Sequence, residues 1–297
     1  MKVLCIDGGG IRGLIPALVL AEIERRTGRR TAEMVDLVAG TSTGGILACA
    51  LTRPGPDDAS FYTAEQLIGL YESEGPKIFH RSLLKRITSA DGYLDERYDS
   101  GGLVTSLRRH LGTVRLADAS PAILLTAYDL ERRRAVFMRR DDDLSMVDAA
   151  HAGAAAPSYF EPVRVGSTTL VDGGVFATNP AMCAYAETEG DLDVLVSLGT
   201  GEQTRPLPYE QVKDWGRLEW ARPVLDVVFD GTADAVDFQL GSLLGAGYVR
   251  LQTPLDEASD EFDDVTPENL AALEREAERL IAARDDELDR LCERLTR

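Results

Sequence analysis

The chain has 297 residues, of which 44% are hydrophobic and 28% charged, which is enough apolar material for a buried core and excludes a disordered or fibrous protein. Its 50 acidic and 32 basic side chains give a formal net charge of −18. Such a surface repels polyanions and argues against a nucleic acid polymer as the main partner. The four cysteines are widely spaced without a C-x-x-C pair, so they predict neither a zinc site nor a disulfide framework.

The first elements predicted along the chain alternate between strand and helix. Residues 3–6 form a short apolar strand that ends in a glycine turn, and a helical pattern follows over 14–26. A second apolar run at 37–39 ends in another glycine turn, and a helix begins at about residue 46. This repeated order predicts parallel strands joined by helical crossovers.

The middle of the chain predicts a helix over 63–73 and then an irregular, glycine-containing segment over 75–102, which we interpret as a mobile flap. Residues 77–86 (KIFHRSLLKR) mix four basic side chains with apolar ones. That pattern is typical of the solvated face of a surface helix, and less often of a membrane-contacting patch.

Further on, two paired strands are predicted at 122–127 and 135–138, and an alanine-rich helix over 144–156 stops before Pro157. A short strand at 169–171 ends in the turn Asp172-Gly173-Gly174.

The last third predicts a strand at 194–198, ending in Gly199-Thr200-Gly201, and helices over 223–244 and 267–295. The final helix is dense in charge, and its heptad register is too short to favour a coiled coil over a helix packed on the surface. We expect one domain: a core over 1–200 and a mainly helical continuation over 201–297.

The N-terminus MKVLCID lacks the long apolar region of a signal peptide, and no stretch reaches the roughly 18 apolar residues of a membrane span. These features predict a cytoplasmic location.

The most specific motif is Gly40-x-Ser42-x-Gly44, which lies directly between a predicted strand and a predicted helix. Small neighbours allow a sharp turn on which the serine hydroxyl projects from the carboxyl edge of the sheet. We therefore predict that Ser42 is a nucleophile.

A serine nucleophile needs a base, and none of His80, His110 and His151 lies late in the chain, where the α/β-hydrolase order would place it. We expect structural or surface roles for all three. Asp172 instead follows a short apolar strand, whose carboxyl edge should be the edge where Ser42 lies. A shielded carboxylate there has a raised pKa and accepts a proton more readily.

The glycine run Gly8-Gly9-Gly10 ends the first strand and offers backbone amides for a tetrahedral oxyanion near a helix N-terminus. Arg12, just beyond, has three interpretations: contact with an anionic head group, orientation of the loop, or a surface salt bridge.

The same stretch matches Gly8-x-Gly10-x-x-Gly13, the loop of dinucleotide-binding proteins. The acid that binds ribose should end the next strand, yet that strand ends in Ala39-Gly40-Thr41-Ser42. Neither glycine turn has the Gly-Lys-Ser/Thr of a P-loop. Both nucleotide-binding interpretations are therefore disfavoured.

Three blocks in order, DGGGIRG at 7–13, GTSTGG at 40–45 and DGG at 172–174, resemble the signatures of patatin-like phospholipases. Residues 154–160 (AAAPSYF) and Asn179-Pro180 resemble the family too, so the match spans about residues 1–200. The resemblance implies an α/β three-layer sandwich with a mostly parallel central sheet, here with a C-terminal helical extension.

The resemblance also implies hydrolysis of fatty acyl esters in membrane phospholipids or galactolipids through an acyl-enzyme, with no metal, calcium or organic cofactor. Ser42 would be the nucleophile and Asp172 the base. The oxyanion hole would be formed by Gly8, Gly9 and Gly10, substrate would be positioned by Arg12 and Gly13, and the motif glycines would be Gly40, Gly44, Gly173 and Gly174.

Short bacterial members with such an N-terminus resemble anti-phage effectors that a cyclic nucleotide assembles and activates against the cell's own membrane. That implies a cyclic nucleotide activator, a homo-oligomer and an active form peripheral to the inner membrane. Two alternatives stay open: an esterase or thioesterase acting on soluble acyl substrates, and a non-catalytic lipid- or nucleotide-binding module.

Overall fold

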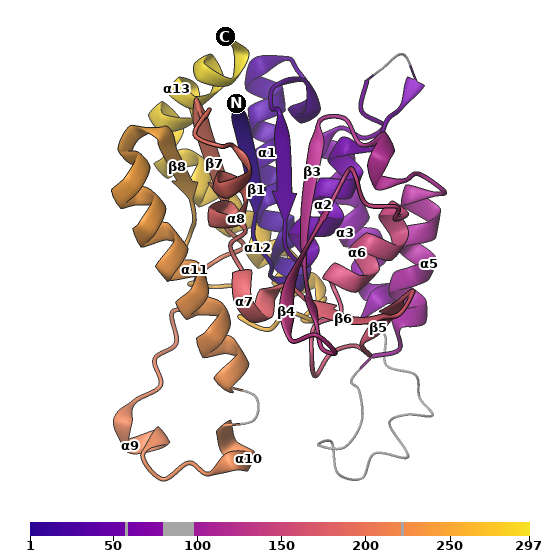
Figure 1. Cartoon of the computed structure of the whole chain (residues 1–297). Helices are drawn as coiled ribbons and strands as arrows, with labels where there is room; N and C mark the ends of the chain where they lie inside the picture. Colours follow the sequence, from indigo (N-terminus) through magenta and orange to yellow (C-terminus); the bar gives the residue numbers. More distant parts are fainter. Residues whose placement is uncertain (57–58, 80–97, 221–222) are drawn as a thin grey trace.

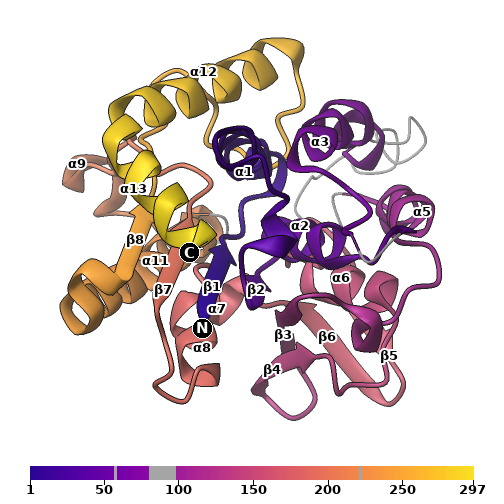
Figure 2. The ribbon, with the colours of Figure 1, turned by 90° about the horizontal axis from the view of Figure 1, so that it is seen from above.

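The computed structural model describes residues 1–56, 59–79, 98–220 and 223–297 (Figure 1). In these residues one 8-stranded sheet has the order β5-β6-β3-β2-β1-β7-β8, and β4 also pairs with β3. Helices cover both faces of the sheet (Figure 2), so the predicted α/β three-layer sandwich is confirmed. None of the helices described is both long and apolar enough to cross a membrane.

Parallel pairing joins five of the strands and antiparallel pairing adds the rest. The parallel strands are β1 (Lys2–Ile6), β2 (Leu37–Gly40), β3 (Ala122–Asp129), β7 (Val194–Leu198) and β8 (Tyr248–Leu251). The antiparallel additions are β4 (Arg134–Arg139), β5 (Val163–Val165) and β6 (Thr168–Asp172).

The helices of the first half are α1 (Leu14–Thr27), α2 (Thr43–Thr52), α3 (Ala64–Ile78), α5 (Ser100–Leu111) and α6 (Met146–Gly153). Those of the second half are α7 (Gly174–Ala177), α8 (Ala181–Glu187), α9 (Tyr209–Val212), α10 (Arg217–Trp220), α11 (Pro223–Leu244), α12 (Pro267–Ala283) and α13 (Asp285–Thr296).

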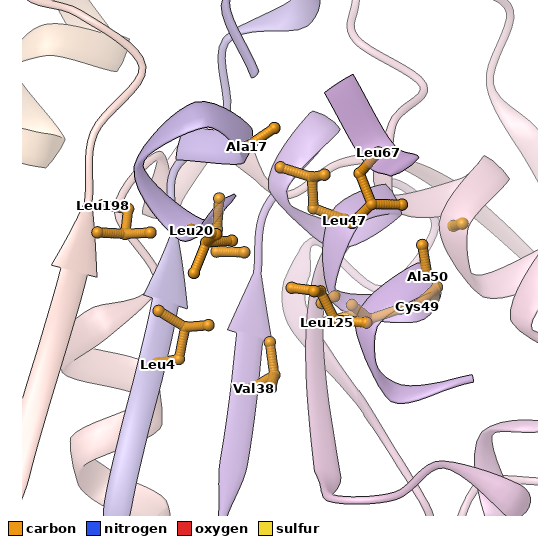
Figure 3. Close-up of a cluster of buried hydrophobic side chains, with 14 of the residues drawn as sticks. Leu4, Ala17, Leu20, Val38, Leu47, Cys49, Ala50, Leu67, Leu125 and Leu198 are labelled. Atoms are coloured by element: carbon orange, nitrogen blue, oxygen red, sulfur yellow. The ribbon is translucent and has the colours of Figure 1, made fainter. Parts of the chain in front are cut away.

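The central strands are buried on both faces because their side chains alternate between two apolar clusters. On one side, Leu4 of β1 and Val38 of β2 pack with Leu20 of α1 and Leu47 of α2 (Figure 3). The intervening side chains point to the opposite face, where they pack against α8 and α11. Burial of both faces holds the carboxyl ends of β1 and β2 in fixed positions.

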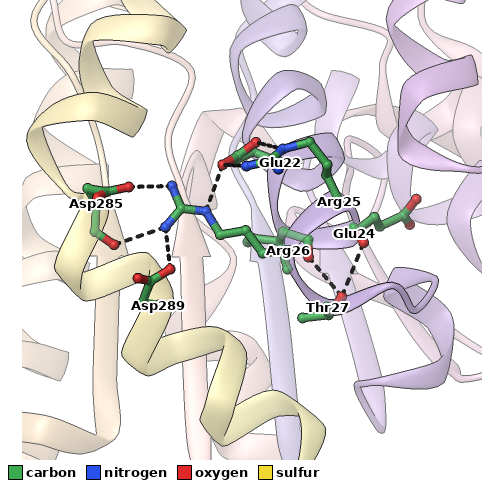
Figure 4. A network of polar contacts seen from close by, with 8 residues as sticks. Glu22, Glu24, Arg25, Arg26, Thr27, Asp285 and Asp289 are labelled. Atoms are coloured by element: carbon green, nitrogen blue, oxygen red, sulfur yellow. Dashed lines mark hydrogen bonds and ion pairs between the residues drawn. The ribbon is translucent and has the colours of Figure 1, made fainter.

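The C-terminal helices are fastened to the core through α1. Arg26 forms ion pairs with Glu22 of the same helix and with Asp285 and Asp289 of α13 (Figure 4). The single helix expected over 267–295 is wrong, because the chain turns at Arg284 so that two shorter helices can pack on α1.

The structure also differs from the predicted elements in the segment 75–102 and at the edges of the sheet. The segment 75–102, predicted to be irregular, begins inside α3 and ends inside α5, while its residues 80–97 lie outside the described chain. Most of the basic patch at 77–86 lies outside it as well. The sequence did not predict β5 or β8, which are short strands near the two edges of the sheet.

Candidate active site

The end-to-end meeting of β2 and β6 brings the two candidate catalytic residues together. β2 runs parallel to β3 and ends with Gly40 opposite Leu125. β6 runs antiparallel to β3 and ends with Asp172 opposite Ala127. Since β4 pairs along this whole stretch of β3 from one edge, β2 and β6 share the other edge, and their carboxyl ends face each other. Ser42 follows β2 at this junction.

This arrangement corrects one step of the sequence reasoning. Asp172 does end a strand, but β6 is antiparallel to its neighbour, so its carboxyl end does not belong to the edge formed by the parallel strands. Asp172 reaches Ser42 because β3 continues past the end of β2, and this extra part of β3 pairs with β6.

Ser42 lies on a sharp turn between β2 and α2 and has φ 54°, a left-handed conformation that is costly for a residue with a Cβ. Helix α2 begins at the next residue, so its N-terminal amides and dipole lie beside the serine. A Cβ on Gly40 would collide with the backbone of Gly44, and a Cβ on Gly44 would collide with the Ile6 carbonyl. The glycines of the motif therefore permit the turn.

We expect Gly40→Ala to lower the free energy of unfolding by roughly 3 kcal/mol, because the obstructing atoms are backbone and the tight elbow must shift to accept a methyl group. Gly45→Ala is the matched control, since a Cβ there meets its nearest atom, in the Leu125 side chain, at 3.4 Å. That control should stay within about 1 kcal/mol of the wild type. Urea unfolding measures both, and equal stabilities would contradict this account of the elbow.

The carboxylate of Asp172 is buried, with 2% of its surface exposed. Burial raises its pKa from 3.8 to about 6, and hydrogen bonds from the Ser42 side chain and the Gly174 amide partly offset that rise. The Gly174 amide lies 2.7 Å from Asp172 Oδ1 and fixes the carboxylate's orientation. A base with a pKa near neutrality, hydrogen-bonded to a serine, is suited to accept the serine proton.

Thr41 ties the serine turn to the aspartate turn. Its hydroxyl donates to the Ala177 carbonyl in α7, at 2.7 Å, and lies 2.7 Å from the hydroxyl of Thr126 in β3. Gly173, after the aspartate, packs so closely on Thr126 that a Cβ there would collide with it. These buried contacts connect the segments before Ser42 and after Asp172.

The three glycines after β1 differ in what their amides can do. The Gly8 amide donates to the Thr178 carbonyl at 3.0 Å, and its own carbonyl accepts from Thr200 Oγ1 at 2.7 Å. Gly8 is thus engaged as structural backbone, and the prediction that all three amides face an oxyanion needs correction. Within the described chain, the amides of Gly9 and Gly10 make no hydrogen bond, so these two are the candidate donors.

Arg12 is buried, with 4% of its surface exposed, so it does not form the surface salt bridge considered above. Its guanidinium lies 4.5 Å from the ring centre of Phe262, and its Nε lies 3.4 Å from the Gly9 carbonyl. These contacts favour the loop-orienting role. Gly13 leaves room for Tyr71 and Thr43, which a Cβ there would strike.

An apolar cavity opens directly from the candidate pair, and Ser42 and Asp172 both line it. Helices α2, α3 and α5 contribute aliphatic side chains to its wall, and aromatic side chains from other segments complete it. Its lining includes Ile46, Ala50, Leu70, Ile78, Phe79, Leu103, Leu107, Leu111, Tyr159, Phe160, Phe229 and Phe262. Such a wall suits a long acyl chain.

Two of these wall residues, Phe229 and Phe262, lie beyond residue 200, where no site residue was predicted. The Phe262 carbonyl also accepts a hydrogen bond from the Ile11 amide at 2.9 Å, so the segment around Phe262 contacts the glycine loop directly. No motif marks either residue, and only the return of the chain onto the site reveals them.

In the described part of the chain, no histidine contacts Ser42. His80 lies outside the described residues. His110 also lines the cavity, and its Nδ1 lies 3.1 Å from the Tyr62 hydroxyl. His151 is mostly buried in α6, and burial lowers its pKa. Neither ring hydrogen-bonds to the serine.

A second, polar cavity lies behind the glycine loop and shares Gly8, Thr178 and Phe229 with the apolar one. Arg250 of β8 pairs there with buried Asp7, with Nη2 2.6 Å from Oδ2. Asp230 of α11 also lines this cavity, and burial raises its pKa to about 6.

The comparison with known families agrees with this geometry. The sequence model of the patatin-like phospholipase family matches residues 4–185, which include both glycine turns and Asp172. The chain belongs to the patatin-like phospholipase family. Membership confirms the predicted resemblance and supports lipid acyl hydrolysis as the general activity.

Plant patatins are similar over nearly the whole chain. The probable inactive patatin-3-Kuras 1 of Solanum tuberosum is 28% identical over 95% of this chain and 86% of its own length. Patatin-like protein 2 of Oryza sativa subsp. indica is 29% identical over 95% and 84%, respectively. Among solved structures, VipD from Legionella pneumophila aligns with TM-score 0.45 and 12% identity over 95% of this chain and 66% of that one.

Proposed function

We propose that this patatin-like chain is a serine acyl hydrolase of the phospholipase A type that releases fatty acids from membrane glycerophospholipids. One observation carries the proposal: buried Asp172, with a pKa of about 6, hydrogen-bonds to Ser42 where an apolar cavity opens. A base, a nucleophile and a hydrocarbon-lined cavity meet at one point. That combination suits cleavage of an ester whose acyl part is long and apolar.

In the proposed mechanism, Asp172 takes the proton of the Ser42 hydroxyl as Oγ attacks the ester carbonyl. The amides of Gly9 and Gly10, with the N-terminus of α2, stabilise the oxyanion. The carbon–oxygen bond to the glycerol breaks, and Asp172 returns the proton to the leaving alcohol. Water then attacks the acyl-enzyme, Asp172 accepts its proton, and Ser42 and a free fatty acid result.

Turnover of fluorescent phosphatidylcholine vesicles by the purified protein, compared with turnover of a short soluble ester, tests this function. We expect kcat/KM to be at least about 10-fold higher on the long-chain lipid, because burial of each extra CH₂ in the cavity contributes roughly 0.8 kcal/mol. Equal activity on both would favour a soluble esterase or thioesterase. Stoichiometric lipid retention without product would favour a binding module.

Activation by a cyclic nucleotide, homo-oligomerisation and a cytoplasmic form that acts at the inner membrane stay predictions from the resemblance. The same vesicle assay, repeated with a panel of cyclic oligonucleotides, tests the activation directly.

A further inference from the structure

A projecting segment, here called the arm, leaves the sheet at the carboxyl end of β7 and returns through α11. It comprises residues 203–220 and 223–228, which include α9, α10 and the first turns of α11. Figure 1 shows α9 and α10 extending away from the body at the end of the molecule where β1 and β7 finish. The candidate active site lies at this same end, because Gly8–Gly10 follow β1 directly.

The arm gathers exposed apolar side chains. Tyr209 is 74% exposed and Val227 is 48% exposed, although a soluble surface favours polar groups at such positions. The other exposed apolar residues of the arm are Leu207, Trp220, Val224 and Val228.

The arm is continuous with one wall of the acyl cavity. Phe229, directly after the exposed pair Val227 and Val228, lines that cavity and reaches Gly174 beside the candidate base. One side of α11 thus walls the site, and the neighbouring side presents valines to solvent. A surface that covered these valines would lie next to this wall of the cavity.

The arm carries almost no net charge of its own. Its residues carry three basic and four acidic side chains, so the net charge of the arm is −1 in a chain of net charge −18. An anionic membrane repels the acidic body, but a zwitterionic lipid surface carries no net charge and tolerates a nearly neutral apolar arm.

Both tryptophans of the chain, Trp215 and Trp220, lie in the arm, with ring centres 5.2 Å apart. Tryptophan is favoured at membrane–water boundaries because it joins a large apolar ring to an N–H donor. The arm therefore has the composition of an interfacial anchor.

We propose that the arm docks on a zwitterionic phospholipid surface and so holds the adjoining wall of the acyl cavity close to the lipid. The proposal rests on the proposed function, because it makes the lipid surface the source of the substrate. Docking would bury the exposed valines and aromatic rings, and a lipid would then pass from the surface into the cavity.

Intrinsic fluorescence tests docking without catalysis, since every tryptophan of the chain lies in the arm. Ser42→Ala protein is titrated with phosphatidylcholine vesicles. We expect a blue shift of the emission, and quenching when the lipids carry bromine on their acyl chains. An unchanged, unquenched emission overturns the proposal, as does a blue shift that follows protein concentration without lipid, which would assign the arm to a second copy.

Paired variants locate the surface. Val227→Ser/Val228→Ser should lower turnover of phosphatidylcholine vesicles at least about 10-fold while leaving turnover of a short soluble ester within about 2-fold. Phe238→Ser/Leu243→Ser is the matched control: both residues are exposed on α11, but at least about 15 Å farther along the helix. It should keep vesicle turnover within about 2-fold of the wild type.

The outcomes separate the two proposals. Equal loss in both pairs, or equal loss on vesicles and soluble ester, contradicts docking by the arm. A wild type inactive on every ester, whose tryptophans still shift on vesicles, refutes the proposed function and leaves docking supported.

Discussion

Ser42→Ala should lower fatty-acid release from phospholipid vesicles by at least about 10⁴-fold, to the limit of detection, because no other group replaces the nucleophile. The change removes one oxygen atom and keeps a Cβ in the same turn, so the free energy of unfolding should stay within about 1 kcal/mol of the wild type. Released fatty acid and urea unfolding are measured on the same preparation.

Ser106→Ala provides the control for this prediction. Ser106 lines the same cavity and is buried, but its side chain hydrogen-bonds to Glu74 instead of the candidate base. Its loss should leave turnover within about 3-fold of the wild type. Full activity in Ser42→Ala, or an equal loss in the two variants, would show that Ser42 is not the nucleophile.

Asp172→Asn should lower kcat/KM by roughly 10³- to 10⁴-fold, because the amide keeps the shape of the carboxylate but cannot accept the serine proton. The pH dependence of kcat/KM also tests whether Asp172 is the base. Since burial raises the pKa of Asp172 to about 6, wild-type kcat/KM on a soluble ester should fall tenfold per pH unit below about pH 6. The residual activity of Asp172→Asn should lack this step.

Asp230→Asn is the control for the pH profile, because burial also raises the pKa of Asp230 to about 6 although it faces the polar cavity. It should keep the acidic step near pH 6. If the step vanishes in Asp230→Asn and persists in Asp172→Asn, the assignment of the base is wrong.

The same substitution has a predictable effect on stability. The folded-state pKa of Asp172 exceeds its ordinary value of 3.8, so the native state binds this proton more tightly than the unfolded state does. The stability gained from it is complete below about pH 3.8 and is lost as the pH rises through about 6. At pH 7, Asp172→Asn should therefore be at least as stable as the wild type.

Much of the fold could be predicted because its elements lie in local patterns. The apolar runs that became β1, β2 and β7 are buried on both faces, and each is followed by a glycine turn. The order strand, glycine turn, helix repeats, and local order of that kind predicts parallel pairing.

The sequence allowed us to predict that Ser42 and Asp172 lie close together. It did not allow us to predict the strand arrangement that brings them together. That arrangement requires β3 to extend beyond the end of β2, and β6 to pair antiparallel with the part of β3 that extends. Register across three strands that lie between residues 37 and 172 leaves no local pattern in one sequence.

The role of Gly8 shows a second limit. Three consecutive glycines look equivalent as amide donors, yet the amide of Gly8 is taken by the Thr178 carbonyl and its carbonyl by the Thr200 hydroxyl. Three residues beyond residue 200 also carry no motif: Phe262 packs on the glycine loop, Phe229 lies beside Gly174, and Arg250 forms an ion pair with Asp7.

Active-site labelling tests the central claim, the Ser42–Asp172 pair, most directly. The protein is treated with a long-chain fluorophosphonate, digested and mapped by mass spectrometry. We expect one adduct per chain, on Ser42, formed at least about 10³-fold more slowly in Asp172→Asn protein that remains folded. An adduct on another residue of the active enzyme, or equal labelling rates in the two proteins, would contradict the claim.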